Sequence, residues 1–196
     1  VIISNPPYIA YDEEIMDTKD AKLQGNHNYE NIMCAIMIAK ELGISNDIIV
    51  NTVKEFSGVE HRIEFVRTLN GKDFYNDSKA TNITSTQIAL NAFKRPVVLL
   101  LGGLDRSQSF LELKDYISTT KLVVCYGECK QRIKEEMESM GIKTIVVDTL
   151  KEATITANEH SSAGDVILLS PGAASWDQYK CFEDRGNEFK EIVRSF

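Results

Sequence analysis

Four short, almost continuously apolar segments divide the second half of this chain into repeating units. They lie at residues 96–101, 122–126, 144–147 and 166–169, and each is followed by a run with helix-like spacing. Strands that are apolar at nearly every position are typical of parallel sheets, which helices cover on both faces. The alternation therefore predicts an α/β fold with a doubly wound, mostly parallel sheet.

A β-hairpin is predicted ahead of this sheet. Residues 63–69 and 72–75 are strand-like and flank Asn70-Gly71, a pair typical of two-residue hairpin turns. The hairpin leads into the polar stretch 76–82 and then into a segment with helical spacing, residues 83–93. The first N–H groups of a helix attract anions, and Lys79 adds a positive charge while Asp77 offers an acceptor suited to a ribose hydroxyl. An ordinary helix cap with a solvated lysine is the open alternative.

Two further loops follow predicted strands, and ligands of such sheets bind beyond the carboxyl ends of the strands. Residues 102–107 begin with Gly102 and Gly103, which permit close backbone approach, and include Arg106, whose guanidinium suits a carboxylate or a phosphate. Residues 170–178 combine small residues with Ser175 and the single tryptophan. A glycine-rich turn with solvated Asp105 and Arg106 is the open alternative for the first loop, and the absence of GxGxxG gives no support to a nicotinamide cofactor.

The N-terminal part is predicted to be helical. One helix opens at residues 25–31 and ends at Gly43, and a second covers residues 47–56. Asn28 and Asn31 lie on one face of the first helix, where they can contact an adenine edge or a phosphate, or can cap the helix. The apolar stripe of this helix comprises Ile32, Ala35, Ile36, Ala39 and Leu42.

Composition narrows the choice of partners. A net charge of −7 argues against binding to nucleic acid or to an anionic membrane surface, and we expect a cytoplasmic monomer. The four cysteines contain no CxxC pair, and the three histidines form no ligand spacing with them, so we expect no metal ligand in this chain. Cys34 and Cys125 are expected to be small core residues. The apolar run 1–3, which lacks an initiator methionine, is interpreted as part of a strand in a longer protein.

Five segments, in this order and spacing, resemble the Mur ligase family: GNHNYEN, EHRIE, NDSKATN, LLLGGLDRSQSF and LLSPGAASWDQYKCFEDRGNEF. The resemblance implies that residues 1–58 are the C-terminal remnant of a central ATPase domain. Residues 59–196 would form the Rossmann-like C-terminal domain that brings the amino acid. The phosphate-binding GxxxxGK[ST] loop and the magnesium ligands are expected upstream, so the fragment alone would be inactive.

The chemistry implied by the resemblance is ATP-dependent amide formation with Mg²⁺. D-Glutamate would be added to UDP-N-acetylmuramoyl-L-alanine in peptidoglycan precursor synthesis, through an acyl phosphate and a tetrahedral intermediate. Other amide ligases of the superfamily, such as a folylpolyglutamate synthase or a later Mur ligase, are the alternatives. A module that binds nucleotide or an acidic amino acid without catalysis is the alternative from another class.

The resemblance also implies roles for the residues that match the family's motifs. Lys79, Arg62 and His61 would be catalytic. Contacts with ATP would come from Asn28, Asn31, Arg62 and Asp77, and those with D-glutamate from Lys79, Thr81, Arg106, Ser175 and Phe182, the last through its backbone.

Three departures from the family pattern accompany these matches. Arg106 stands where many members have lysine, so the match is to charge, and a guanidinium holds a carboxylate with two hydrogen bonds where an ammonium acts as a point charge. Gly172 and Ala173 also differ from the usual residues. Trp176 is larger than the leucine of some members, and we expect it to affect how the substrate pocket closes.

Overall fold

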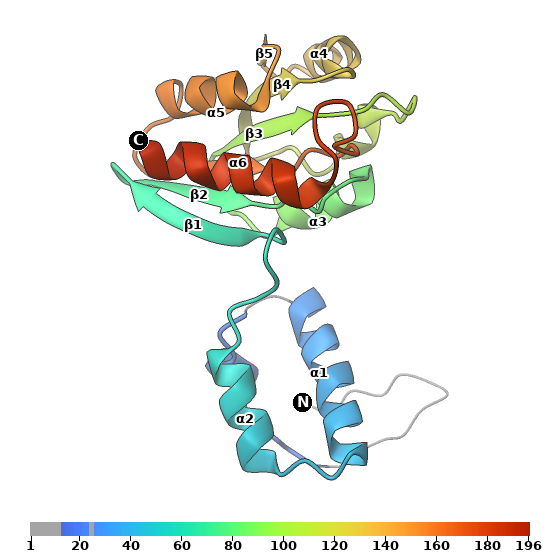
Figure 1. Ribbon diagram of the computed structural model, residues 1–196, viewed down its shortest axis with the longest axis vertical. Coiled ribbons are helices and arrows are strands. Elements are labelled where there is room, and N and C mark those ends of the chain that lie inside the picture. Colours follow the sequence, from blue (N-terminus) through green and yellow to red (C-terminus); the bar gives the residue numbers. More distant parts are fainter. Residues whose placement is uncertain (1–12, 24–25) are drawn as a thin grey trace. The chain divides into compact units, whose positions relative to one another are not determined.

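The computed structural model describes residues 13–23 and 26–196, and the apolar run predicted at residues 1–3 lies outside them. The chain folds as two compact units, Val1–Gly58 and Val59–Phe196, which are described in turn. Their elements are labelled in Figure 1. None of the described helices has the length and hydropathy needed to cross a membrane.

The described part of the first unit contains two α-helices. They are α1 (Asn26–Glu41) and α2 (Asn46–Glu55), and a short 3₁₀ helix, η1 (Thr18–Asp20), precedes them. Gly43 ends α1 with a positive φ of 74°, as its place at the end of the apolar stripe predicts. The ammonium of Lys40 contacts Glu13 at 2.7 Å and Asn46 at 2.9 Å, which ties the end of α1 to the start of α2.

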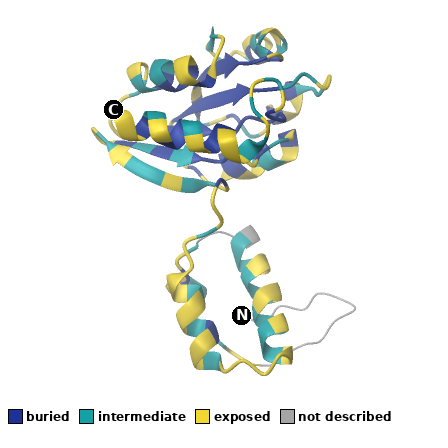
Figure 2. Cartoon of the chain, in the orientation of Figure 1, coloured by how far each residue is buried: buried dark blue, intermediate teal, exposed yellow. Residues whose placement is uncertain are grey.

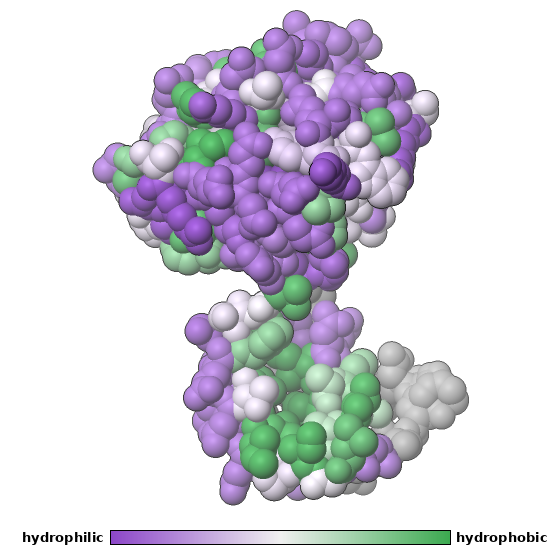
Figure 3. All heavy atoms as spheres, viewed as in Figure 1, coloured by the Kyte–Doolittle hydropathy of each residue, from purple (hydrophilic) through white to green (hydrophobic). Residues whose placement is uncertain are grey.

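The first unit buries few apolar side chains. Figure 3 shows hydrophobic side chains gathered over α1 and α2, and Ile38, Leu42, Ile48 and Phe56 are exposed. The predicted core position of Cys34 is wrong, because this side chain is exposed. Cys34 lies two residues from both Ile32 and Ile36, a spacing that places it on the opposite side of the helix.

The second unit is built on a six-stranded sheet with the order β1-β2-β6-β3-β4-β5. Only β1 and β2 pair antiparallel, and all other neighbours are parallel, so the predicted mostly parallel sheet with a leading hairpin is confirmed. Asn70 and Gly71 form the hairpin turn with φ of 52° and 76°. The strands are β1 (Glu64–Leu69), β2 (Lys72–Asn76), β3 (Val97–Gly102), β4 (Thr120–Tyr126), β5 (Thr144–Val146) and β6 (Val166–Leu169).

Helices cover both faces of the sheet, as the apolar strands predict. They are α3 (Ile83–Asn91), α4 (Lys130–Ser139), α5 (Leu150–Glu159) and α6 (Phe182–Ser195). The expectation of a helix after every strand is wrong for β3, which is followed by a polar loop and the four-residue 3₁₀ helix η2 (Phe110–Leu113). The carboxylate of Glu136, on α4, accepts hydrogen bonds from Phe110 and Leu111 at the start of η2.

Alternating side chains of β3, in the middle of the sheet, pack into two separate hydrophobic cores. Leu99 and Leu101 pack with α3, η2 and α4, whereas Val98 and Leu100 pack with α5 and α6. All four are fully buried, and Figure 2 shows the buried strands between the two helix layers. The connecting loops, and not the two helix layers, lie at the carboxyl ends of the parallel strands.

Candidate functional site

The loops that follow β2, β3 and β6 lie together at the carboxyl edge of the sheet. Their backbones are hydrogen-bonded to one another: Gly172 N–H donates to Ala80 at 3.0 Å, and Leu104 N–H donates to Ala174 at 2.8 Å. A Cβ at Gly103 would lie 2.3 Å from the carbonyl oxygen of Ala174, so the predicted close backbone approach is confirmed. Three loops distant in the sequence therefore form one surface.

A fully buried arginine, Arg185, joins these loops. Its guanidinium donates to the Ser78 hydroxyl at 3.0 Å, to the Ser78 carbonyl at 2.8 Å and to the Ala173 carbonyl at 3.0 Å. A weaker bond of 3.4 Å reaches the carbonyl of Gly102. The Ser78 hydroxyl in turn donates to the carbonyl of Phe182 at 2.7 Å. Arg185 thus links α6 to all three loops, a role that the sequence analysis missed.

His61 lies buried beneath Phe182. Its Nδ1 accepts a hydrogen bond of 2.9 Å from the amide of Asn76, and its ring meets the Phe182 ring edge-on at 5.9 Å. Burial is the main cause that lowers the pKa of His61 below its usual value, and the positive charge of Lys190 lowers it further. A neutral, internally bonded imidazole of this kind is suited to positioning its neighbours.

Asp77 is also buried, with both carboxylate oxygens engaged. They accept hydrogen bonds from the N–H of Ile63 at 3.2 Å and from the hydroxyl of Ser170 at 2.8 Å. Burial raises the pKa of Asp77 to about 7, while the neighbouring positive charge of Arg62 acts in the opposite direction. Each carboxylate oxygen has two lone pairs, so an ionised Asp77 retains acceptor capacity. Arg62 itself is exposed.

Asn28 and Asn31 belong to the first unit. Both lie in the first half of α1, where Asn28 is half-buried and Asn31 is exposed. Their three-residue separation keeps them on one face of the helix, as predicted.

Lys79 and Thr81 project from the loop between β2 and α3. Lys79 is exposed, and its ammonium lies 4.7 Å from the centre of the Phe182 ring. Thr81 is half-buried one position before Asn82, whose side chain caps α3 by accepting a hydrogen bond of 2.9 Å from Ser85 N–H. The capping alternative therefore holds for Asn82, and the lysine remains available to a ligand.

Arg106 and Ser175 lie on the two other loops. The guanidinium of Arg106 is 4.7 Å from the centre of the Trp176 ring, and Ser175 is buried. Among the residues that the structure describes, neither Arg106 nor Lys79 forms an ion pair. The edge of the sheet thus carries two cations, Lys79 and Arg106, whose charge no described acidic side chain neutralises.

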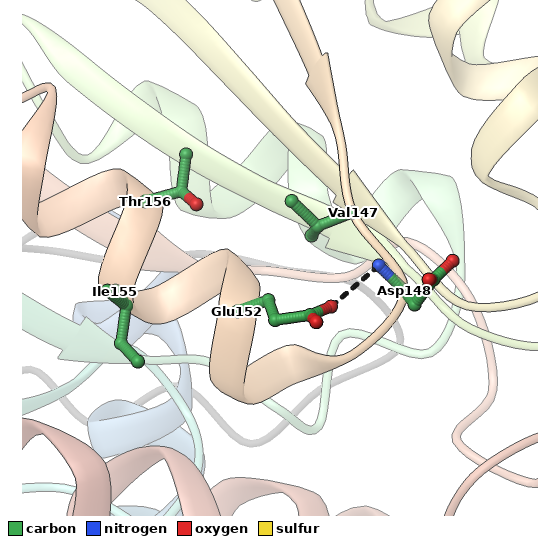
Figure 4. A pocket seen from close by; sticks show the side chains of 5 residues that line it. All are labelled: Val147, Asp148, Glu152, Ile155 and Thr156. Carbon is green, nitrogen blue, oxygen red and sulfur yellow. Dashed lines mark hydrogen bonds between the residues drawn. The ribbon is translucent and has the colours of Figure 1, made fainter.

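Two surface hollows lie near this edge. One of about 580 Å³ is lined by Trp176, Gln178, Tyr179 and Lys180. The other, of about 360 Å³, lies between the end of β5 and α5 (Figure 4). In the second, the Glu152 carboxylate accepts hydrogen bonds from the N–H groups of Asp148 and Thr149, which makes it part of the α5 cap. Within residues 13–23 and 26–196, no cluster of three or more acidic, histidine or cysteine side chains is arranged to hold a metal ion.

A doubly wound α/β unit, with loops gathered beyond the carboxyl ends of its parallel strands, defines the class of this protein's second unit. Within that class, residues 61–172 match the family described as "Mur ligase, glutamate ligase domain". The chain belongs to the Mur ligase family.

Comparisons of sequence and of structure with known proteins both agree with this family. The chain is 50% identical over 182 residues to a UDP-N-acetylmuramoylalanine–D-glutamate ligase of Bacillus thuringiensis (strain Al Hakam), a match that covers 92% of this chain and 40% of that protein. The same identity and coverage hold for the ligase of that name from Bacillus cereus (strain 03BB102). The chain therefore spans about 40% of the length of the curated relatives that it matches.

Solved structures share the fold at low sequence identity. The UDP-N-acetylmuramate-alanine ligase MurC of Thermotoga maritima superimposes with a TM-score of 0.67 and 17% identity, over 89% of this chain and 39% of that one. MurF from Acinetobacter baumannii gives a TM-score of 0.63 at 17% identity, over 86% and 39%.

Proposed function

We propose that the full-length protein is an ATP-dependent amide ligase that adds D-glutamate to UDP-N-acetylmuramoyl-L-alanine. Residues 1–58 would then be the end of its central ATPase domain, and residues 59–196 its glutamate ligase domain. The proposal is supported by the 50% identity to ligases of that name. We expect the enzyme to act as a monomer in the cytoplasm, where its nucleotide-linked substrates are made.

The observation that carries the proposal is the pair of cations at the sheet edge that no described acidic side chain neutralises. Lys79 and Arg106 lie on loops that are both hydrogen-bonded to the loop after β6. D-Glutamate has two carboxylates, and an ammonium and a guanidinium provide a positive partner for each. Thr81 and Ser175 would add hydroxyl donors, the former to the main carboxylate and the latter to the side-chain carboxylate, where the Phe182 backbone also contributes.

Amide formation requires a carboxylate to be activated before the amine attacks. The γ-phosphoryl group of ATP is transferred to the carboxylate of the UDP-sugar peptide, so that phosphate can later leave. The amine of D-glutamate then forms the C–N bond, the C–O bond to phosphate breaks, and the amine loses a proton. Lys79 would stabilise the negative charge that develops during this sequence. His61 would act through Phe182, which it contacts, and so help to position Lys79.

The residues assigned to ATP fit a nucleotide in their chemistry. Arg62 is an exposed guanidinium beside Asp77, an arrangement suited to phosphate and to a ribose hydroxyl respectively. Asn28 and Asn31 would supply amide groups to the adenine side. Any Mg²⁺ would be held by residues upstream of this chain.

The test is a substrate panel on the full-length enzyme. Phosphate release is measured with UDP-N-acetylmuramoyl-L-alanine and ATP in the presence of D-glutamate, L-glutamate, L-lysine or meso-diaminopimelate, and with a folate substrate plus L-glutamate. We expect the highest kcat/KM with D-glutamate. A preference for another amino acid would support a later Mur ligase, a preference for folate would support a folylpolyglutamate synthase, and binding without turnover would support a non-catalytic module.

A further inference from the structure

Trp176 is an exposed aromatic side chain with a charged group stacked on it. Trp176 is 63% exposed, and the guanidinium carbon of Arg106 lies 4.7 Å from the centre of its ring. At this distance, a guanidinium is attracted to the π face of an indole. Arg106 and Trp176 come from different loops, those after β3 and β6, so the contact depends on how these loops are joined.

The loop after β4 joins them. Its Glu128 carboxylate accepts a hydrogen bond of 3.2 Å from Asp105 N–H, and its own N–H donates to the Asp177 carboxylate at 3.1 Å. Asp105 immediately precedes Arg106, and Asp177 immediately follows Trp176. Both loops are therefore hydrogen-bonded to Glu128 at the residue next to the stacked pair, through the backbone of Asp105 and the side chain of Asp177.

The acidic side chains nearby are engaged elsewhere. Asp105 forms an ion pair with Arg132 at 3.0 Å and accepts from Ser107 N–H at 2.8 Å. Glu128 and Asp177 each accept a backbone N–H, as described above. Because an aromatic face attracts a guanidinium without using its N–H groups, Arg106 is held in place while its fork of donors stays available for a carboxylate.

We propose that Trp176 is a positioning residue that orients Arg106 for binding a carboxylate of the incoming acidic amino acid. The inference rests on the proposed function, since it concerns the same substrate. It predicts that the indole acts only through Arg106 and contributes to affinity for the amino acid more than to turnover. Lys79 lies over the Phe182 ring at the same distance of 4.7 Å, so Lys79 and Arg106 each have an aromatic partner.

The experiment is a double-mutant cycle in the full-length enzyme, with KM for D-glutamate and kcat measured at saturating ATP and UDP-N-acetylmuramoyl-L-alanine. Trp176→Ala is expected to raise KM roughly 3- to 10-fold with kcat changed less than about 2-fold. Trp176→Phe should restore most of the affinity. In an Arg106→Ala background, Trp176→Ala should have no further effect. Leu111→Ala, which removes another exposed apolar side chain, is the matched control and should leave KM unchanged.

Each outcome decides between distinct conclusions. An unchanged KM in Trp176→Ala, or the same increase with and without Arg106, overturns the positioning role while the wild-type substrate preference still supports the proposed function. A wild-type enzyme that prefers a non-acidic amino acid overturns both. Melting temperatures of all variants are measured in parallel, and Trp176→Leu, which keeps an apolar side chain but removes the aromatic face, provides the same test if Trp176→Ala fails to fold.

Discussion

Lys79 and Arg106 show how single residues define this site. Both are exposed cations without an ion-pair partner among the described residues, and both lie over an aromatic ring. Charged side chains usually contribute little to stability at the surface, so their placement is better explained by a ligand than by folding. The sequence identified both residues from their loops, but it did not indicate the rings on which they rest.

Lys79→Ala in the full-length enzyme is expected to reduce kcat on the order of 10²-fold, because the proposed function places this positive charge near the reacting phosphate. Its free energy of unfolding should change by less than about 1 kcal/mol, since the side chain is exposed. Steady-state kinetics and chemical denaturation measure the two effects. Lys94→Ala, which removes an exposed lysine at the opposite edge of the sheet, serves as the control. Unchanged turnover in Lys79→Ala would leave this residue with no catalytic role.

Asp77 should make the stability of the protein depend on pH. Burial raises the pKa of Asp77 to about 7, so the folded protein binds this proton more tightly than the unfolded chain does. The resulting stabilisation of the folded state is present at low pH and is lost as the pH rises through 7. Compared with Asp77→Asn, the wild-type protein should lose up to about 2 kcal/mol of unfolding free energy between pH 5 and pH 8. Denaturant titrations of both proteins at the two pH values provide the measurement. Parallel pH dependences in the two proteins would contradict a raised pKa.

At the scale of elements, α6 determines how the loops are held. Its buried face includes Arg185, Phe189 and Val193, spaced four residues apart, so an arginine occupies a position of the apolar stripe. That spacing was visible in the sequence and could have identified Arg185. Its partners could not be predicted, because carbonyl groups of three distant loops leave no pattern along the chain.

Gly186 provides the test of this packing. A Cβ at this position would lie 2.2 Å from Nδ1 of His61 and 3.0 Å from Cβ of Ser78. Helix propensity alone favours alanine over glycine by about 1 kcal/mol, whereas overpacking costs about 1–3 kcal/mol. We expect Gly186→Ala to lower the melting temperature, and Asn187→Ala, an exposed change in the same helix, to have little effect. A stabilised Gly186→Ala variant would show that His61 does not pack against α6 as described.

At the scale of the whole molecule, the sequence predicted the second unit better than the first. Continuous apolar strands, together with the Asn70-Gly71 turn, were enough to predict a mostly parallel sheet with a leading hairpin. The helix expected after β3 is absent, and a polar loop with the short 3₁₀ helix η2 takes its place. In the first unit, an apolar stripe predicted the helix but not the exposure of its side chains, which depends on what packs against them.

The central claim is that loops from distant parts of the chain form one binding site for a dicarboxylic amino acid. The most direct measurement is KM for D-glutamate in full-length Thr81→Ala and Ser175→Ala enzymes, with Thr84→Ala and Ser118→Ala as exposed controls. Each site variant removes a hydrogen-bond donor to a carboxylate, an interaction of about 1.5–3 kcal/mol, so KM should rise roughly 10- to 150-fold. Unchanged KM values in both site variants would contradict the claim.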